Sequence, residues 1–215
     1  MEFARLIENE APAFQLSLSS SVIASCESYY ALLQRWNTAV NLMADLDPLE
    51  VARFHFLESM YAVHFISPST RNHIDLGSGA GFPAIPLKLL LPTLRNFLYE
   101  SRSRRCAFLK ELIRELKLSN VSIIPINISS VSIRKLHMPF DIITFRAIQF
   151  DSKLLNALVS VMPVEGRLLV WHGQASPHRD YLLHDPRLVE IEKRRIPTSR
   201  ARFISIFERD AIAKK

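Results

Sequence analysis

The sequence predicts an α/β protein in which a helical N-terminal extension precedes a seven-stranded, mostly parallel sheet. Residues 1–70 show helical periodicity, and from His73 onwards short apolar runs alternate with helical segments. Alternating strands and helices form parallel sheets that are covered on both faces. The expected strands are residues 73–76, 96–99, 121–126, 140–145, 167–172, 187–195 and 202–208. Because only residues 196–201 join the last two, these strands are expected to pair antiparallel.

The helical extension is predicted to span residues 1–70. Apolar residues recur at helical spacing between Val22 and Trp36 and form one apolar face. Asp47 and Pro48 have the residue types of an N-cap and a first helical position, so a second helix begins there.

This second helix is expected to end near Phe65, because Ser67-Pro68-Ser69 then breaks the pattern. The second domain is therefore expected to comprise residues 71–215. Within it, residues 104–117 form an amphipathic helix with one apolar and one basic face.

Composition indicates a globular protein with one domain plus an extension. The chain has 215 residues, 48% of them hydrophobic, but no apolar run long enough to cross a membrane and no signal peptide pattern. Cys26 and Cys106 occupy apolar helical positions, which predicts buried free thiols and a cytoplasmic location. The scattered histidines and cysteines predict no metal site.

Charge is distributed unevenly along the chain. Residues 1–70 carry three Lys or Arg and eight Asp or Glu, whereas residues 71–215 carry 24 and 13, a net charge of +11. Such an excess indicates a polyanionic partner, and nucleic acid is the obvious one. The alternative is a basic, soluble surface without a partner.

A glycine-rich loop is the strongest functional signal. Gly77, Gly79 and Gly81 directly follow the first predicted strand, which contains Asp75. The dinucleotide-binding pattern needs a glycine where Phe82 stands. The G-x-G-x-G spacing after an acidic residue is instead typical of class I S-adenosylmethionine (AdoMet) methyltransferases, with an ordinary tight turn as the alternative.

An acidic residue at the end of the next strand supports a nucleotide ligand. Glu100 lies 23 residues after Gly77, close to the distance at which such residues accept hydrogen bonds from ribose hydroxyls. A solvated glutamate at a strand end is the alternative interpretation.

Further motifs cover most of the chain. They are L-x-x-W-N-x-x-x-N-L from Leu33, His55-Phe56-Leu57-Glu58-Ser59, the run from Asp75 to Leu87, Glu100-Ser101 with Arg104-Arg105, and Phe140-Asp141 through Arg146-Ala147. In these motifs the chain resembles the RsmG family of 16S rRNA guanine-N7 methyltransferases, also called glucose-inhibited division protein B. The resemblance implies a Rossmann-like class I AdoMet-dependent methyltransferase fold, AdoMet as cofactor, and 16S rRNA or the small ribosomal subunit as partner.

The resemblance also implies roles for individual residues. The implied cofactor-binding residues are Asp75, Gly77, Ser78, Gly79, Gly81, Phe82, Glu100, Ile128, Ser129 and Arg146. Ile128 and Ser129 would border the adenine. Arg146 would lie where cofactor and target base meet, and is the implied catalytic residue. Since guanine N7 carries a lone pair and no proton, methyl transfer needs alignment rather than a general base.

Three departures from the family pattern leave an alternative open. Ser129 replaces an acidic residue, His172 a lysine, and Ala84 a glycine. A catalytically weakened or inactive rRNA-binding factor of the same fold is therefore the second hypothesis. A small-molecule methyltransferase is the third, and the basic balance of residues 71–215 argues against it. The cations expected to contact RNA are Arg102, Arg104, Arg105, Arg134, Lys135, Lys193, Arg194, Arg195, Arg200 and Arg202.

Overall fold

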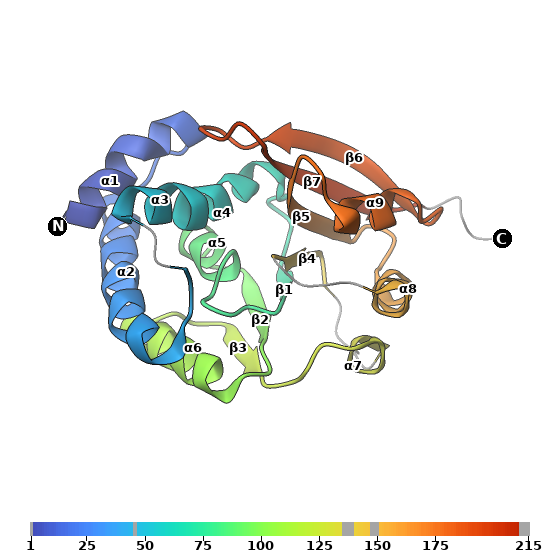
Figure 1. Ribbon diagram of the computed structural model, residues 1–215, viewed down its shortest axis with the longest axis horizontal. Coiled ribbons are helices and arrows are strands. Elements are labelled where there is room, and N and C mark those ends of the chain that lie inside the picture. The colour runs from blue at the N-terminus through green and yellow to red at the C-terminus, as the bar shows by residue number, and fades with distance from the viewer. Residues whose placement is uncertain (1, 45–46, 135–139, 147–150, 211–215) are drawn as a thin grey trace.

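One twisted sheet organises the molecule, and helices lie on both of its faces (Figure 1). The computed structural model describes residues 2–44, 47–134, 140–146 and 151–210. The sheet has seven strands in the order β3-β2-β1-β4-β5-β7-β6. Their bounds are β1 Asn72–Leu76, β2 Arg95–Tyr99, β3 Val121–Ile124, β4 Ile142–Phe145, β5 Arg167–Gly173, β6 Leu188–Arg195 and β7 Arg202–Arg209. Each strand predicted from the sequence is confirmed to within a few residues.

The strands pair as the alternating pattern predicts. β3, β2, β1, β4 and β5 run parallel, and β7 is antiparallel to both β5 and β6. The antiparallel pairing of the last two strands is thus confirmed. The sequence did not indicate that β7 enters the sheet between β5 and β6, because an antiparallel hairpin satisfies either order.

The helices of the extension agree with the predicted segments. The extension contains α1 Glu2–Glu10, a 3₁₀ turn Ala11–Phe14, α2 Ser20–Val40, α3 Pro48–Val51, a π-helical turn Ala52–Leu57, α4 Glu58–Tyr61 and a 3₁₀ turn Ala62–Phe65. Asp47 caps α3 as predicted, with Oδ1 accepting a hydrogen bond of 2.9 Å from the Glu50 amide. The helical run from Pro48 ends at Phe65, also as predicted.

Among the described residues, five α-helices accompany the strands. They are α5 Ala84–Leu90, α6 Ser103–Glu115, α7 Ser130–Arg134, α8 Ser152–Val161 and α9 Pro177–Leu183. The first four lie between the first five strands, as the pattern predicts. The short α9 was not foreseen, since its sequence shows no clear amphipathic period over seven residues.

Two hydrophobic clusters occupy the two faces of the sheet. The larger joins α1, α2 and the Pro48–Phe65 helical run to α5 and α6, and the smaller lies under α7 and α8. The extension therefore shares a core with one face of the sheet, from β2 to β7. The proposed boundary after residue 70 stays a prediction. Cys26 and Cys106 are buried free thiols, as predicted.

Candidate active site

Strand register brings three of the predicted site residues to one edge of the sheet. Leu76 pairs with Tyr99 in β2 and with Phe145 in β4. The residues that follow these positions are Gly77, Glu100 and Arg146. They lie at the carboxyl edge, where parallel sheets of this kind bind their ligands.

Glu100 fixes the glycine loop from within the protein. Its Oε2 accepts a hydrogen bond of 2.9 Å from the Gly79 amide, and Oε1 accepts one of 2.8 Å from the Arg102 amide. The side chain is buried, which removes the alternative of a solvated strand-end glutamate. Each carboxylate oxygen can accept a further hydrogen bond.

The loop backbone requires glycine at three positions. Gly77, Gly79 and Gly81 have φ values of 69°, 55° and 94°. Residues other than glycine rarely adopt this left-handed region. The Ser78 hydroxyl donates to the Asp75 carbonyl over 3.1 Å, so it stabilises the turn itself.

Gly81 has a second reason to be glycine. A Cβ at this position would lie 2.6 Å from the Tyr29 hydroxyl and 2.9 Å from a side-chain carbon of Ile85. The Tyr29 hydroxyl donates to the Ala80 carbonyl, and its ring stacks on Phe82 with centroids 5.2 Å apart. The extension therefore packs directly against the loop, and the Phe82-Pro83 peptide bond within it is cis.

Asp75 is a fully buried carboxylate beneath the loop. Its Oδ1 accepts a hydrogen bond of 2.6 Å from Thr144, whose Oγ1 also lies 2.7 Å from Nε2 of His73. Its Oδ2 is buried and has no hydrogen-bond partner among the described residues. Burial, with a smaller effect of the Glu100 charge, raises the pKa of Asp75 from 3.8 to about 7, against the opposing hydrogen bonds.

Arg146 belongs to a charged cluster at the same edge. Its Nη2 donates to the Phe54 carbonyl over 2.6 Å and lies 3.7 Å from Oε1 of Glu58. Arg202 approaches the same Glu58 oxygen at 3.0 Å. Burial raises the pKa of Glu58, and the two guanidinium groups oppose that shift.

His55 connects this cluster to the glycine loop. Its ring centroid lies 5.0 Å from that of Phe82. Burial, and then the charges of Arg146 and Arg202, lower the pKa of His55 to about 3, so the ring is neutral. Loop and cluster thus form one continuous region.

Ile128 and Ser129 lie farther along, after β3. Ile128 is half-buried against the smaller hydrophobic cluster. Ser129 caps α7: its Oγ accepts from the Ser132 amide over 3.2 Å, and its amide donates to Ser132 Oγ over 2.8 Å. Within the described part of the chain, no hydrogen bond joins either residue to the glycine loop.

His172 lies on the sheet face that carries the smaller cluster. Its ring nitrogens contact the Gly173 carbonyl at 2.7 Å and Ser205 Oγ at 2.8 Å. Burial lowers its pKa, so it holds no permanent charge in place of the family's lysine. Ala84 is also fully buried.

The predicted RNA-contacting cations differ in their surroundings. Nη2 of Arg105 donates to the Asn41 carbonyl over 3.4 Å, and its Nη1 lies 3.5 Å from a Cβ built on Gly79. Arg194 pairs with Glu192 at 2.5 Å. The exposed members are Arg102, Arg104, Arg134, Lys193, Arg194, Arg195 and Arg200. Lys135, like Ala147 of the Arg146-Ala147 motif, lies outside the described residues.

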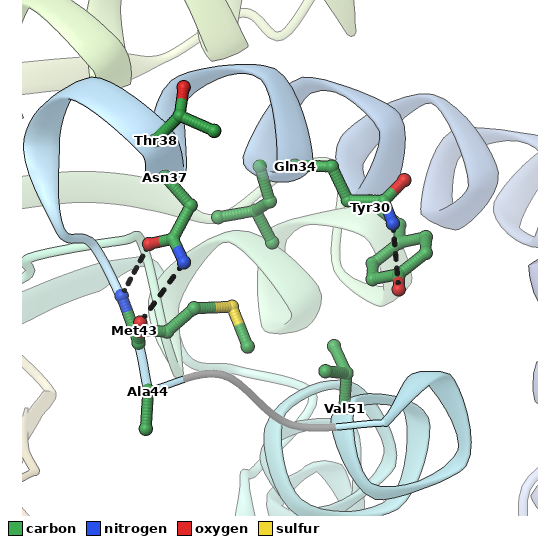
Figure 2. A pocket seen from close by; sticks show the side chains of 8 residues that line it. Tyr30, Gln34, Asn37, Thr38, Met43, Ala44 and Val51 are labelled. Carbon is green, nitrogen blue, oxygen red and sulfur yellow. Dashed lines mark hydrogen bonds between the residues drawn. The ribbon is translucent and has the colours of Figure 1, made fainter.

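A separate pocket of about 380 Å³ lies between α2, the loop after it and α3 (Figure 2). Its polar side chains already pair with nearby groups. Gln34 donates to Tyr30 over 3.0 Å, while Asn37 accepts from the amides of Leu42 and Met43 and donates to the Met43 carbonyl. Asn37, part of the W-N motif, therefore shapes the chain after α2.

Sequence reasoning did not place Tyr29, His55 or Glu58 in the site. Tyr29 was assigned to an apolar helical face, which is correct but omits its hydroxyl. His55 and Glu58 are three residues apart in a helical run, so they share a face. That spacing, within the family motif His55-Phe56-Leu57-Glu58-Ser59, is the signal in the sequence.

Comparison with known proteins identifies the family of this chain. A family model, GidB, described as rRNA small subunit methyltransferase G, matches residues 22–198. The chain belongs to this family. It is 35% identical over 169 residues to a Roseiflexus protein named Ribosomal RNA small subunit methyltransferase G, covering 78% of this chain and 72% of the relative. A relative of the same name from Streptococcus pyogenes is 29% identical over 97% of this chain and 90% of its own.

Solved structures show the same fold at low identity. An SAH-bound methyltransferase of Podospora anserina aligns with a TM-score of 0.61 at 13% identity, covering 94% of each chain. TrmN from Thermus thermophilus aligns with a TM-score of 0.57 at 14% identity, covering 82% of this chain and 53% of its own. The predicted class I methyltransferase fold is therefore confirmed.

The described residues lack two further features. None of their helices combines the length and apolar character needed to cross a membrane. None of their His, Cys, Asp and Glu side chains gather in groups of three or more suited to hold a metal ion.

Proposed function

We propose that this member of the GidB family transfers a methyl group from AdoMet to N7 of a guanine in 16S rRNA of the small ribosomal subunit. The observation that carries the proposal is the buried Glu100 carboxylate bonded to the Gly79 amide, since it joins the loop and the acidic residue into one unit. The proposal of an rRNA substrate rests on family membership. The proposal of guanine N7 as the methylated atom rests on the resemblance to the RsmG family. A reaction on rRNA also fits the predicted cytoplasmic location.

The residues of the loop fit AdoMet. Asp75 Oδ2 is a buried acceptor without a partner among the described residues, beneath the loop. Glu100 has acceptor capacity left for ribose hydroxyls. Gly77, Ser78, Gly79 and Phe82 would line the methionine and ribose parts, with Gly81 setting the loop's packing. Ile128 and Ser129 would border the adenine.

Alignment of base and methyl group is the protein's main task in this reaction. Bound AdoMet supplies an activated methyl group. Guanine N7 presents an in-plane lone pair and no proton, so no residue has to act as general base. The neutral His55 and the buried Arg146 would flank the entering base. Arg146, whose Nη1 is buried without a partner in the described part, would donate to the base.

No observation favours the inactive alternative. Ala84 is the fully buried first residue of α5. His172 forms hydrogen bonds with Gly173 and Ser205 on the sheet face that carries the smaller cluster. Ala84 has no polar side-chain atom and the His172 ring bonds elsewhere, so neither side chain forms a hydrogen bond with the described glycine loop. Ser129 remains the departure that bears most directly on the adenine.

Two measurements test the proposal. Calorimetry with AdoMet should show binding that Glu100→Gln weakens, whereas Glu192→Gln, which changes a half-exposed carboxylate on β6, should not affect it. Mass spectrometry of 16S rRNA from cells with and without the protein should show loss of one N7-methylguanosine. Unchanged N7-methylguanosine would refute the substrate, and absence of AdoMet binding would refute the enzyme.

A further inference from the structure

Glu58 comes from the N-terminal extension, yet its carboxylate lies at the carboxyl edge of the sheet. It is the first residue of α4, and its side chain is only 1% exposed. Its Oε1 lies 3.0 Å from Nη2 of Arg202 and 3.7 Å from Nη2 of Arg146. One carboxylate thus joins guanidinium groups from the end of β4 and the start of β7.

The backbone around Glu58 is fixed by the same neighbours. Trp171 Nε1 donates to the Glu58 carbonyl over 3.2 Å. Arg146 donates to the Phe54 carbonyl, and the Arg202 guanidinium lies 5.1 Å from the centre of the Phe54 ring. Because three strands hold this helical turn, the carboxylate has a fixed position relative to the sheet.

The charges in this cluster depend on one another. A carboxylate buried this deeply persists in its charged form only when it is paired. Arg146 and Arg202 supply that pairing, and Glu58 in turn lies between two like charges, of which that of Arg202 is partly exposed to solvent. Without the carboxylate, the two guanidinium groups would repel each other and Arg146 would lose one of its two anchors.

The pairing leaves one donor of Arg146 unused. Its Nη1 is buried and has no hydrogen-bond partner within the described part of the chain. A buried donor of this kind costs free energy until it meets an acceptor. Guanine O6 is adjacent to N7 on the same edge of the base. A donor that bonds O6 orients the base and leaves the N7 lone pair free.

We propose that Glu58 is a positioning residue: it holds Arg146 so that Nη1 meets the acceptor oxygen of the target guanine. This inference rests on the proposed function. Glu58 acts through Arg146 and touches neither cofactor nor base. Its removal should therefore slow rRNA methylation while AdoMet binding stays unchanged.

Glu58→Gln is the first test, because it removes the charge and keeps the shape. We expect kcat/KM for rRNA to fall about tenfold to a hundredfold, the cost of a misplaced contact, with the same Kd for AdoMet. Glu10→Gln is the matched control, since Glu10 forms a two-bonded pair with Arg53 in the same extension. A Glu58→Gln rate equal to that of wild type or of Glu10→Gln overturns the proposal.

A second comparison keeps the test valid if Glu58→Gln alone does not fold. It compares Arg202→Gln with a double variant that has the net charge of the wild-type cluster. Arg202→Gln retains the Glu58 contact with Arg146, whereas Arg202→Gln combined with Glu58→Gln removes it and restores the net charge of the wild-type cluster. We expect the double variant to methylate rRNA more slowly than Arg202→Gln. Equal rates would show that Glu58 does not act through Arg146.

A third measurement needs neither cofactor nor RNA. Phenylglyoxal modifies accessible arginines, and mass spectrometry locates the adducts. Arg146 should be protected in the wild type and in Glu10→Gln, and reactive in Glu58→Gln. Equal reactivity in all three overturns the anchoring, whatever the substrate. A wild type that binds no AdoMet but protects Arg146 would instead refute the proposed function alone.

Discussion

At the scale of single residues, the carboxyl edge of the sheet holds ionisable groups that are cut off from water. Asp75 and His73 are joined through Thr144, and Glu58 is held by two arginines. Burial disfavours the charged form of each carboxylate. The site therefore depends on partners that offset this cost, and substitutions there should have pH-dependent effects.

Asp75→Asn should reveal the raised pKa of the native carboxyl group. Because the folded pKa, about 7, exceeds the usual 3.8, the folded state binds an extra proton between these values. The contribution of this carboxyl group to the free energy of unfolding is present at low pH and is lost as the pH rises through 7. The wild type should thus lose roughly 2 to 3 kcal/mol relative to the variant between about pH 5 and pH 8. Urea unfolding at both pH values measures this, and a pH-independent difference would contradict it.

Tyr29→Phe should destabilise the protein by about 1 to 3 kcal/mol, because it leaves the buried Ala80 carbonyl without its donor. AdoMet binding should weaken as the loop loosens. Tyr181→Phe, at a half-exposed ring, is the control. Chemical unfolding and calorimetry report the two effects.

The same hydroxyl restricts Gly81, so the two positions should be coupled. Gly81→Ala brings a Cβ to 2.6 Å from the Tyr29 hydroxyl in the wild type. In the Tyr29→Phe background this clash is absent, and the alanine should cost less unfolding free energy. Additive costs in a double-mutant cycle would argue against direct contact.

At the scale of elements, the end of α2 explains two residues of the family motif. Asn41 is the C-cap, with a left-handed φ of 52°, and its carbonyl accepts from Arg105. Asn37 holds the next two amides. Both asparagines therefore serve the turn that carries the chain from α2 towards α3, and Arg105 joins that turn to the glycine loop.

Asn41→Gly and Asn41→Val should separate backbone conformation from side-chain chemistry. Glycine adopts the left-handed region freely and should be nearly neutral. Valine should cost about 1 to 2 kcal/mol, because its Cβ crowds the following carbonyl there. Thermal unfolding of the two variants gives the comparison, and equal stability would exclude a conformational role.

At the scale of the whole molecule, the acidic residues 1–70 and one face of the sheet contribute to the same hydrophobic cluster. The extension packs on the sheet and supplies Tyr29, His55 and Glu58 to the site, while most cations lie in residues 71–215. Under the proposed function, this division would leave residues 1–70 to shape the site and the basic surface to attract RNA.

The affinity for an rRNA fragment should fall steeply with salt. Changing both Arg195 and Arg200, which are exposed, to Gln should reduce the slope of log K against log salt by about 0.7 for each phosphate that these cations neutralise. Arg35→Gln, which removes an exposed cation of the acidic extension, should leave the slope unchanged. Filter binding over a salt series tests this, and equal slopes for all three proteins would exclude a role of Arg195 and Arg200 in phosphate binding.

Local sequence patterns specify the strands, the predicted helices, the glycine loop and its acidic partner Glu100, because these features depend on local periodicity and on backbone conformations that only glycine adopts readily. Family motifs added Arg146. Three features are visible only in the folded chain. β7 lies between β5 and β6, the Tyr29 hydroxyl bonds the glycine loop, and Glu58 pairs with both Arg146 and Arg202. These contacts link residues 51 to 144 positions apart, and no local pattern encodes them. Packing of the helices against the sheet brings buried charges and hydroxyls from distant segments together. These groups must then form hydrogen bonds and ion pairs with one another, because they no longer contact water.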